Sequence, residues 1–284
     1  MTTITKQTAL DISAQMTIPG RKMNFEFDLN ELPRYWHGGD VFKTTYMNAL
    51  SCLFPEGERM FIDAVRDNQH FVKDEALLRQ VKGFIKQEAI HGHEHSQFNK
   101  YLDSLGYPAS KVEAFEKKEK VLMKKYLPAI SRLSVTCAIE HFTAIMAHDI
   151  LNNPKSTEGM DEKFKALWQW HAVEETEHKA VAFDVYQQAG GSYIRRIIGM
   201  MLITVMFCLR ASTVQAIFLW KDGKLFSPKV WWQGAKMYFG KGGLVRSIWR
   251  DYIDYYRPSF HPWDHDNREL LQDWIEKGQS YKTV

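Results

Sequence analysis

The chain has 284 residues, of which 45% are hydrophobic and 25% are charged, and its formal net charge at pH 7 is +3. This length is enough to bury a large core, and so small and dispersed a charge argues against a nucleic-acid-binding protein. The cysteines Cys52, Cys137 and Cys208 are scattered, so we expect reduced thiols in a cytoplasmic protein. The N-terminus has no apolar core segment, and no signal peptide is expected.

The first forty residues are polar and irregular. Pro19-Gly20 and Gly38-Gly39 interrupt any helical pattern there. We therefore expect residues 1–40 to form an N-terminal arm that wraps a helical domain. No part of the chain shows the alternation of a β-strand, which predicts an all-α protein.

The first helical segment follows the arm, and its apolar residues recur at intervals of three and four. This stripe consists of Met47, Leu50, Phe54, Phe61 and Val65. Glu58 lies on the same stripe, so it faces the expected core. Pro55 stands three residues before Glu58 and predicts a kink or a fresh helix start.

The next three segments share this feature. Residues 77–105 carry Glu88 and His91 on their apolar stripe, with Asp74 placed to cap the helix and Gly106 to end it. The third segment carries Glu140 in the same way. The fourth, a stripe over residues 164–185, carries His171, Glu175 and His178.

One pattern therefore occurs twice: a lone glutamate is followed, on the next segment, by Glu-x-x-His. The first copy is Glu58 with Glu88 and His91, and the second is Glu140 with Glu175 and His178. A Glu and a His three residues apart lie on one helix face and can bind the same metal ion. The doubled pattern is the ligand set with which four-helix bundles hold two iron or manganese ions.

Four buried carboxylates without counter-charge would be very costly. Two divalent cations, together with the imidazoles, would remove that cost. The alternative is a metal-free core of carboxyl–imidazole hydrogen bonds. We expect two metal ions, with iron preferred and manganese or zinc as alternatives.

Several stretches show a family resemblance. They are FPEGERMF (54–61), QEAIHGHEH (87–95), AIEHFTA (138–144), WHAVEETEHKAVAFDVY (170–186) and YYRPSFHPWD (255–264). With these stretches the chain resembles a bacterial family of predicted metal-dependent hydrolases with a ferritin-like dinuclear-metal site. The resemblance implies a ferritin-like four-helix bundle over residues 41–190, although the fold does not dictate the reaction.

His171 precedes Glu175 by four residues and His178 by seven, so the three share a helix face. This arrangement is similar to that of the di-iron arylamine N-oxygenases, in which an additional histidine binds the iron pair. The resemblance implies a metal site made of Glu58, Glu88, His91, Glu140, His171, Glu175 and His178. The alternative for His171 is a histidine that supports the ligands from outside, or a core histidine stacked on an aromatic ring, next to Trp168 and Trp170.

Other ionisable residues lie near these positions. His95, one turn beyond His91, is expected to support the site without binding metal. Five further residues lie off the apolar stripes, namely His93, Glu94, His141, Glu174 and Glu177. We expect them to be solvated or to contact the ligands from outside. Glu174 is the main rival to Glu175, because a one-residue rotation of the helix would exchange them.

The ligand pattern is compatible with two kinds of reaction. An Fe(II) pair can reduce O2, whereas a zinc or manganese pair can activate water for hydrolysis. The helical-bundle ligand set favours an O2-dependent oxidase or oxygenase that acts on a small apolar substrate. The alternatives are a metal-dependent hydrolase using the same site and a non-catalytic metal-binding or membrane-docked protein.

Residues 191–284 are expected to form a helical extension packed on the bundle. Residues 197–220 are long and apolar enough for a transmembrane helix, but Arg210 near their middle argues against one. We expect this helix to pack on the bundle and cover the site; an interfacial helix and the wall of a substrate tunnel are the alternatives. The aromatic and basic residues of 195–250 suggest a peripheral membrane contact or a homodimer interface.

Overall fold

Helices make up nearly all of the regular structure in this computed structural model, which describes residues 7–23, 25, 32–276 and 282–283. Within those ranges the one sheet pairs β1 (Arg21–Lys22) with β2 (Lys282–Thr283) in antiparallel fashion. The predicted all-α fold is confirmed, with a short strand pair that no sequence pattern indicated. The arm, expected to be irregular, also forms α1 (Ala9–Gln15), which the side chain of Thr8 caps.

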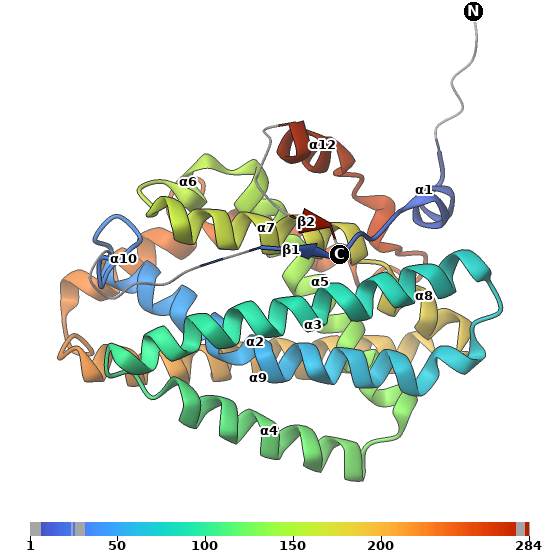
Figure 1. Cartoon of the computed structure of the whole chain (residues 1–284), viewed down its shortest axis with the longest axis horizontal. Helices are drawn as coiled ribbons and strands as arrows, with labels where there is room; N and C mark the ends of the chain where they lie inside the picture. The colour runs from blue at the N-terminus through green and yellow to red at the C-terminus, as the bar shows by residue number, and fades with distance from the viewer. Residues whose placement is uncertain (1–6, 24, 26–31, 277–281, 284) are drawn as a thin grey trace, which may run out of the picture.

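Four helices carry the predicted apolar stripes and pack around a shared centre. They are α2 (Val41–Asn68), α3 (Glu75–Ser104), α5 (Ala129–Asn152) and α7 (Glu162–His178). α2 packs along both α3 and α5, and α5 packs against α7. Figure 1 shows α2 and α3 side by side along the long axis of the molecule. The inner faces of the four helices therefore meet away from solvent.

α3 begins and ends where the sequence predicts. Asp74 accepts a hydrogen bond from Ala76 N at 2.8 Å, which satisfies a donor that the helix leaves unpaired. At the other end Gly106 has a φ of +89°, which glycine adopts without a steric penalty. The N–H of Tyr107 then donates to the carbonyl of Leu102 and closes the helix. These ends fix which residues of α3 face the centre.

α2 runs without interruption through Pro55, so a fresh helix start does not occur there. Proline has no N–H, which leaves the carbonyl of Ser51 without its helical partner. Asn99 of α3 supplies the missing donor, because its Nδ2 lies 3.1 Å from Ser51 O. The carbonyl left free by the proline is thereby part of a hydrogen bond that links α2 to α3.

The fourth predicted helix is split, which corrects the expectation of one stripe over residues 164–185. α7 ends at His178, and α8 (Val181–Gln188) begins three residues later. In the break, Lys179 is buried and its Nζ donates to His265 O at 2.7 Å and to Asn267 Oδ1 at 2.8 Å. These contacts come from residues far along the chain, so helical periodicity gives no sign of them.

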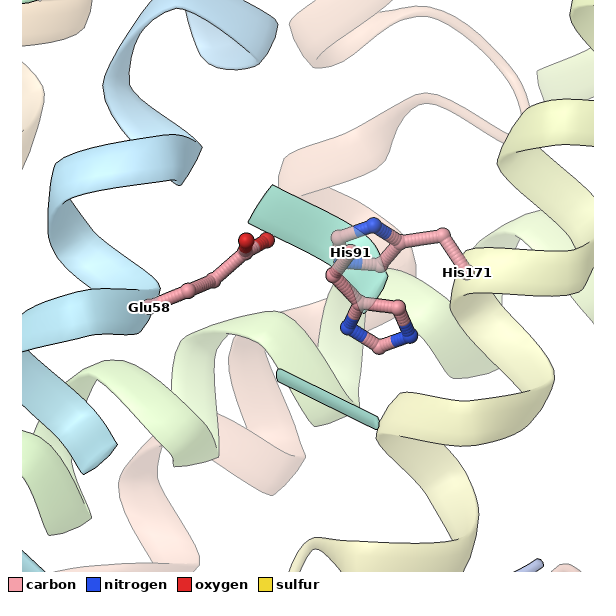
Figure 2. A group of neighbouring side chains, drawn as sticks. All are labelled: Glu58, His91 and His171. Atoms are coloured by element: carbon pink, nitrogen blue, oxygen red, sulfur yellow. The ribbon is translucent and has the colours of Figure 1, made fainter. Parts of the chain in front are cut away.

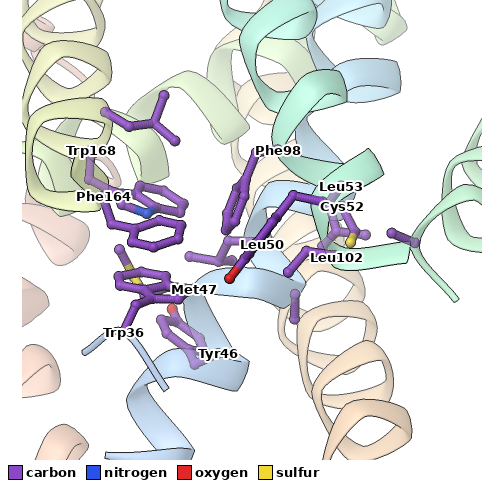
Figure 3. Close-up of a cluster of buried hydrophobic side chains, with 14 of the residues drawn as sticks. Trp36, Tyr46, Met47, Leu50, Cys52, Leu53, Phe98, Leu102, Phe164 and Trp168 are labelled. Atoms are coloured by element: carbon purple, nitrogen blue, oxygen red, sulfur yellow. The ribbon is translucent and has the colours of Figure 1, made fainter. Parts of the chain in front are cut away.

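An aromatic cluster fills one part of the core and fastens the arm to the bundle (Figure 3). Trp36 of the arm is 1% exposed and stacks on Phe164 of α7, with ring centroids 4.4 Å apart. Phe98 of α3 contacts the same ring at 5.2 Å. Removing a buried aromatic side chain of this size typically costs about 3–5 kcal/mol. The arm is therefore part of the core and not a loose covering.

The other helices cover the bundle. They are α4 (Ala109–Tyr126), α6 (Pro154–Thr157), α9 (Tyr193–Lys221), α10 (Pro228–Phe239), α11 (Leu244–Asp254), α12 (Arg268–Glu276) and the 3-10 turns η1 (Gln69–Phe71) and η2 (Pro262–Asp264). α9 packs on α2 and α5, α10 packs on α2, and α11 packs on α5. The predicted divisions at residues 40 and 190 stay predictions.

α9 contains the long apolar run and is long and apolar enough to cross a membrane. It packs on the bundle, yet only 22% of its most apolar stretch is buried. Arg210, the residue that argues against a membrane span, is paired with two carboxylates of α4, Glu116 at 2.7 Å and Glu119. The pairing lowers the expected penalty for placing Arg210 in an apolar environment.

Candidate metal centre

The four inner helices bring all seven predicted ligands into one buried cluster. They contribute Glu58 from α2, Glu88 and His91 from α3, Glu140 from α5, and His171, Glu175 and His178 from α7. None of these residues is more than 5% exposed. Because ionised carboxylates are unstable in an apolar interior without a partner, protons or cations must neutralise the cluster.

One set of three ligands, the Glu58 group, consists of Glu58, His91 and His171. Each residue offers one ligand atom, and the three atoms lie within 4.8 Å of one another. In Figure 2 the carboxylate of Glu58 points from α2 toward the two imidazoles. Gly92 leaves room for that carboxylate, since a Cβ at this position would lie 3.0 Å from Glu58 Oε2. The Glu58 group can therefore surround one metal ion.

A second set, the Glu88 group, consists of Glu88, Glu175 and His178, with ligand atoms again within 4.8 Å of one another. His178 Nε2 lies 3.0 Å from Glu88 Oε1 and 3.5 Å from an oxygen of Glu140. Glu140 thus completes the surroundings of this second position.

Glu175 connects the two groups. Its Oε1 lies 3.1 Å from His171 Nε2 and 3.5 Å from His91 Nδ1. Its Oε2 lies 3.5 Å from His178 Nε2. One carboxylate with an oxygen toward each group is placed to bridge two cations.

Most of the candidate ligand atoms of the cluster lack hydrogen-bond partners. Buried atoms in this condition include both carboxylate oxygens of Glu58, Glu88 and Glu140, Oε2 of Glu175, Nδ1 of His91 and Nε2 of His178. The short approach of His178 to Glu88 does not have hydrogen-bond geometry. Each unsatisfied buried polar group costs about 1–3 kcal/mol, and such groups are rare in folded proteins. A convergent set of them fits bound metal ions.

Two imidazoles are oriented by acceptors on their far side. His91 Nε2 lies 3.0 Å from Glu174 Oε2, and His178 Nδ1 lies 2.9 Å from Gln87 Oε1. An acceptor on one ring nitrogen fixes the proton there and leaves the other nitrogen to the metal, as is common for histidine ligands. Glu174 is therefore a partner of His91, whereas Glu175 faces His91, His171 and His178. The choice of Glu175 as a metal ligand stays a prediction.

Arg21 of the arm holds both acceptors in place, Glu174 directly and Gln87 through Glu177. Arg21 Nη1 lies 3.3 Å from Glu174 Oε1 and 2.7 Å from Glu177 Oε2, while its Nη2 lies 2.6 Å from Glu177 Oε1. Glu177 Oε2 also accepts from Gln87 Nε2 at 2.7 Å. Neither Arg21 nor Gln87 could be predicted from the sequence, because neither belongs to a periodic pattern that points to the site.

The structure agrees with some of the predictions for the residues that lie off the apolar stripes and disagrees with others. His93 is exposed, as expected. Glu174 and Glu177 are buried and contact the ligands or their partners from outside. Glu94 and His141 are also buried, so solvation was the wrong expectation for them. The ring of His141 is held by the carbonyl of Asp251 at 3.0 Å.

His171 is positioned by a chain of hydrogen bonds that crosses α3 and α2. Its Nδ1 lies 2.8 Å from His95 Nε2, and His95 Nδ1 lies 2.9 Å from Ser51 Oγ. Ser51 Oγ donates to Asn99 Oδ1 at 2.9 Å. The expected supporting role of His95 agrees with these contacts.

The direction of this chain follows from Asn99. Its Nδ2 faces two acceptors, Ser51 O and Glu113 Oε1, so its Oδ1 must be the atom that accepts from Ser51. Ser51 Oγ then accepts from His95 Nδ1, and His95 Nε2 accepts from His171 Nδ1. This order leaves a lone pair on His171 Nε2 facing the cluster, which favours a ligand role over that of a stacked core histidine.

The protonation pattern of the cluster follows from its burial. Burial raises the pKa of the Glu58 and Glu140 carboxyls well above their usual range. Burial lowers the pKa of His91, but its contacts with Glu174 and Glu175 outweigh burial and raise that pKa to about 10. In the metal-free protein, protons therefore occupy the cluster. Metal ions must displace them, so metal affinity should fall as the pH is lowered.

A cavity of about 490 Å³ leads away from the cluster. His171 and Glu175 line its inner end. The rest of its wall comes from α2, α5, α6, α10, other residues of α7, and the segments that precede α7 and α11. No residue of the α9 run 197–220 lines this cavity, so that run does not form the wall of this cavity, the tunnel alternative considered from the sequence.

Fold and site together define the class: an all-α protein with buried glutamates and histidines arranged for metal binding. A sequence model of the family described as "predicted metal-dependent hydrolase" matches residues 19–266. The chain therefore belongs to the predicted metal-dependent hydrolase family, as its resemblance indicated. Comparison with curated proteins and with solved structures found no match. The likeness to ferritin-like proteins and to arylamine N-oxygenases stays a prediction.

Proposed function

We propose that this protein is a metal-dependent hydrolase that uses two divalent metal ions held by α2, α3, α5 and α7. The observation that carries the proposal is the convergence of buried ligand atoms without hydrogen-bond partners at the inner end of a cavity. Family membership favours hydrolysis over the O2-dependent oxidation preferred from the sequence. Two such ions, when bound, lower the pKa of a water molecule and polarise a substrate oxygen.

The side chains would divide the remaining work. The Glu58 group would hold one ion and the Glu88 group, with Glu140, the other, while Glu175 would contact both. Phe54 and Trp168 line the cavity beside His171 and would keep bulk water from the reacting bond. Oxygen and nitrogen ligands suit iron, manganese and zinc alike, so the identity of the metal is a matter for measurement.

O2-dependent oxidation of an apolar substrate is the second candidate. Four glutamates in a helical core are the ligand type that di-iron and di-manganese bundle proteins share. Fe(II) at this site would supply electrons to O2, which the hydrolytic reaction does not need. The two candidates use the same ligands and differ in the metal and the co-substrate.

A parallel assay separates the candidates. Protein loaded with zinc or manganese is expected to hydrolyse activated acyl esters, whereas a His178→Ala variant treated in the same way is expected to be at least tenfold slower because it lacks one ligand. Fe(II)-loaded protein is expected to react slowly with O2. Rapid O2 consumption without ester hydrolysis would refute the hydrolase and support the oxidase. Metal binding without either activity would support a non-catalytic protein.

We also propose that the exposed face of α9 contacts an anionic membrane surface. The apolar side chains exposed along it include Ile194, Ile198, Met201, Leu202, Val205 and Leu209. Arg195 and Lys221 lie at the two ends of the helix, and exposed Trp220 and Trp232 follow nearby. Apolar residues flanked by tryptophan and basic residues suit the interface of a bilayer with acidic head groups.

Vesicle flotation tests this contact. The protein is expected to bind phosphatidylglycerol vesicles at low salt and to be released at high salt, because screening weakens attraction between the basic residues and the head groups. A Leu202→Glu substitution on the exposed face should weaken binding without loss of the fold, since Leu202 is 57% exposed. No binding at low salt, together with a stable dimer that Leu202→Glu dissociates, would assign this face to a homodimer instead.

A further inference from the structure

The cavity that ends at the metal cluster changes in character along its length. Its inner end is formed by His171 and Glu175, its middle is apolar, and its outer rim carries four lysines. The apolar middle is lined by Met47, Leu50, Phe54, Met146, Ala147 and Ile150. A volume of about 490 Å³ is typical of a site for a small organic ligand.

α2 sets the distance from the rim to the cluster. Successive residues on one of its faces are Lys43, Met47, Leu50, Phe54 and Glu58, at intervals of three or four. Lys43 lies at the rim and Glu58 in the cluster. Glu58 follows Lys43 by 15 positions, which corresponds to about 22 Å of helix. A ligand that reaches both ends must therefore be elongated.

The rim offers positive charge to the outer end of such a ligand. Lys43, Lys236 and Lys241 form no ion pair with a carboxylate in the described part of the chain. Lys236 lies over the ring of Trp232 at 5.5 Å, which keeps its ammonium near the surface. The fourth lysine, Lys155, donates from its Nζ to the backbone carbonyl of Lys241 at 3.0 Å. One of its donors is therefore not available to a ligand.

Two of the three acidic residues at the rim form hydrogen bonds within the fold. Asp40 caps α2 by accepting from the N–H of Lys43 at 3.0 Å. Asp149 is buried and accepts a hydrogen bond from Ser156 Oγ. Glu158 is exposed at the rim. The balance of side chains that can turn toward a ligand is therefore positive.

We infer that the substrate is an anionic amphiphile, with an acidic head group at the lysines of the rim, a single apolar chain in the cavity, and the hydrolysable bond at the remote end of that chain. The reaction in this inference rests on the proposed function, whereas the binding mode does not. Hydrolysis would break the acyl C–O or C–N bond of an ester or amide. Water would supply a hydroxyl to the acyl carbon and a proton to the leaving group.

Binding of a homologous series to the purified protein tests the inference. The probes are linear alkanoates from butyrate to palmitate, with the alcohols and alkylammonium ions of equal chain length. We expect affinity to rise with chain length until the cavity is full, and we expect the acids to bind more tightly than the alcohols and the ammonium ions. The Lys236→Gln/Lys241→Gln double variant should bind acids roughly tenfold more weakly and alcohols as before, since exposed ion pairs contribute modestly.

A cavity variant checks the location. Ala147 lines the apolar middle on α5 and is 3% exposed, so Ala147→Leu should fill part of the cavity and weaken the long chains while leaving the short ones unchanged. Equal binding of acids, alcohols and ammonium ions in the wild type would overturn the inference, as would a lysine double variant that keeps its preference for acids. If the protein binds the acids as monomers, the ligand is a free amphiphile. If it binds only vesicles that contain the acid, and this binding depends on the lysines, the ligand comes from a membrane.

The hydrolase proposal can be refuted independently of the binding mode. Metal content should be unchanged in the lysine double variant, because neither lysine belongs to the groups of ligand atoms in the cluster. Absence of metal or of esterase activity in the wild type, with the preference for long acids intact, would refute the hydrolase and leave the binding mode standing.

Discussion

His178→Ala is expected to remove at least half of the bound metal and to destabilise the metal-free fold by about 3–5 kcal/mol. Burial alone would lower the pKa of His178, but the surrounding carboxylates, Glu175 first, raise it well above its usual range. Without metal, His178 is thus a buried cation beside the negative charge of Glu175, whose pKa the neighbouring histidines hold well below its usual range. Its loss leaves that negative charge uncompensated.

A matched variant separates ligand loss from charge loss. Glu140→Gln also removes a ligand, yet it should hardly change the stability of the metal-free fold. Burial raises the pKa of Glu140 well above its usual range, so this carboxyl is already neutral there. Metal analysis after dialysis, and urea unfolding of chelator-treated protein, check both expectations. Full metal retention in both variants would contradict the site.

The second large effect concerns the arm. Arg21→Met is expected to destabilise the protein by about 3–5 kcal/mol, because Arg21 is 2% exposed and is paired with Glu174 and Glu177. It should also lower metal affinity roughly 10- to 100-fold, since those carboxylates orient His91 and, through Gln87, His178.

The double variant Arg21→Met/Glu177→Gln is the control for this effect. It leaves less uncompensated charge in the interior, so its free energy of unfolding should recover part of the loss while metal affinity stays low. Stability is measured by urea unfolding and metal affinity by competition with a chelator. A double variant no more stable than Arg21→Met alone would mean that charge pairing is not what Arg21 contributes.

The buried positions of the candidate ligands could be predicted from the sequence because each lies on a helix with a regular apolar stripe. On such a helix, spacing alone determines that Glu88 and His91 point the same way, and the turn signals at Asp74 and Gly106 set the limits of the helix. Four such stripes leave few ways to bury their polar residues, so convergence was a sound expectation.

What the sequence did not reveal depends on contacts between distant segments. Arg21 meets Glu177 across 156 positions of the chain, and Ser51 meets His95 across 44. No local period encodes such pairs. The same reason explains Arg210, which is costly as an isolated charge but lies beside Glu116 of α4 in the folded chain. The break after α7 is a further case, since Lys179 is held by residues near the C-terminus.

The most direct test of the central claim is the metal content of the full-length protein purified without added metal. We expect about two transition-metal ions per chain, as in other helical bundles with a doubled Glu and Glu-x-x-His pattern. Glu175→Ala, which removes the carboxylate between the two groups, should reduce this number to one or none. A wild-type protein that stays metal-free after incubation with Fe(II), Mn(II) and Zn(II), and is fully folded, would contradict the account and favour a core of carboxyl–imidazole hydrogen bonds.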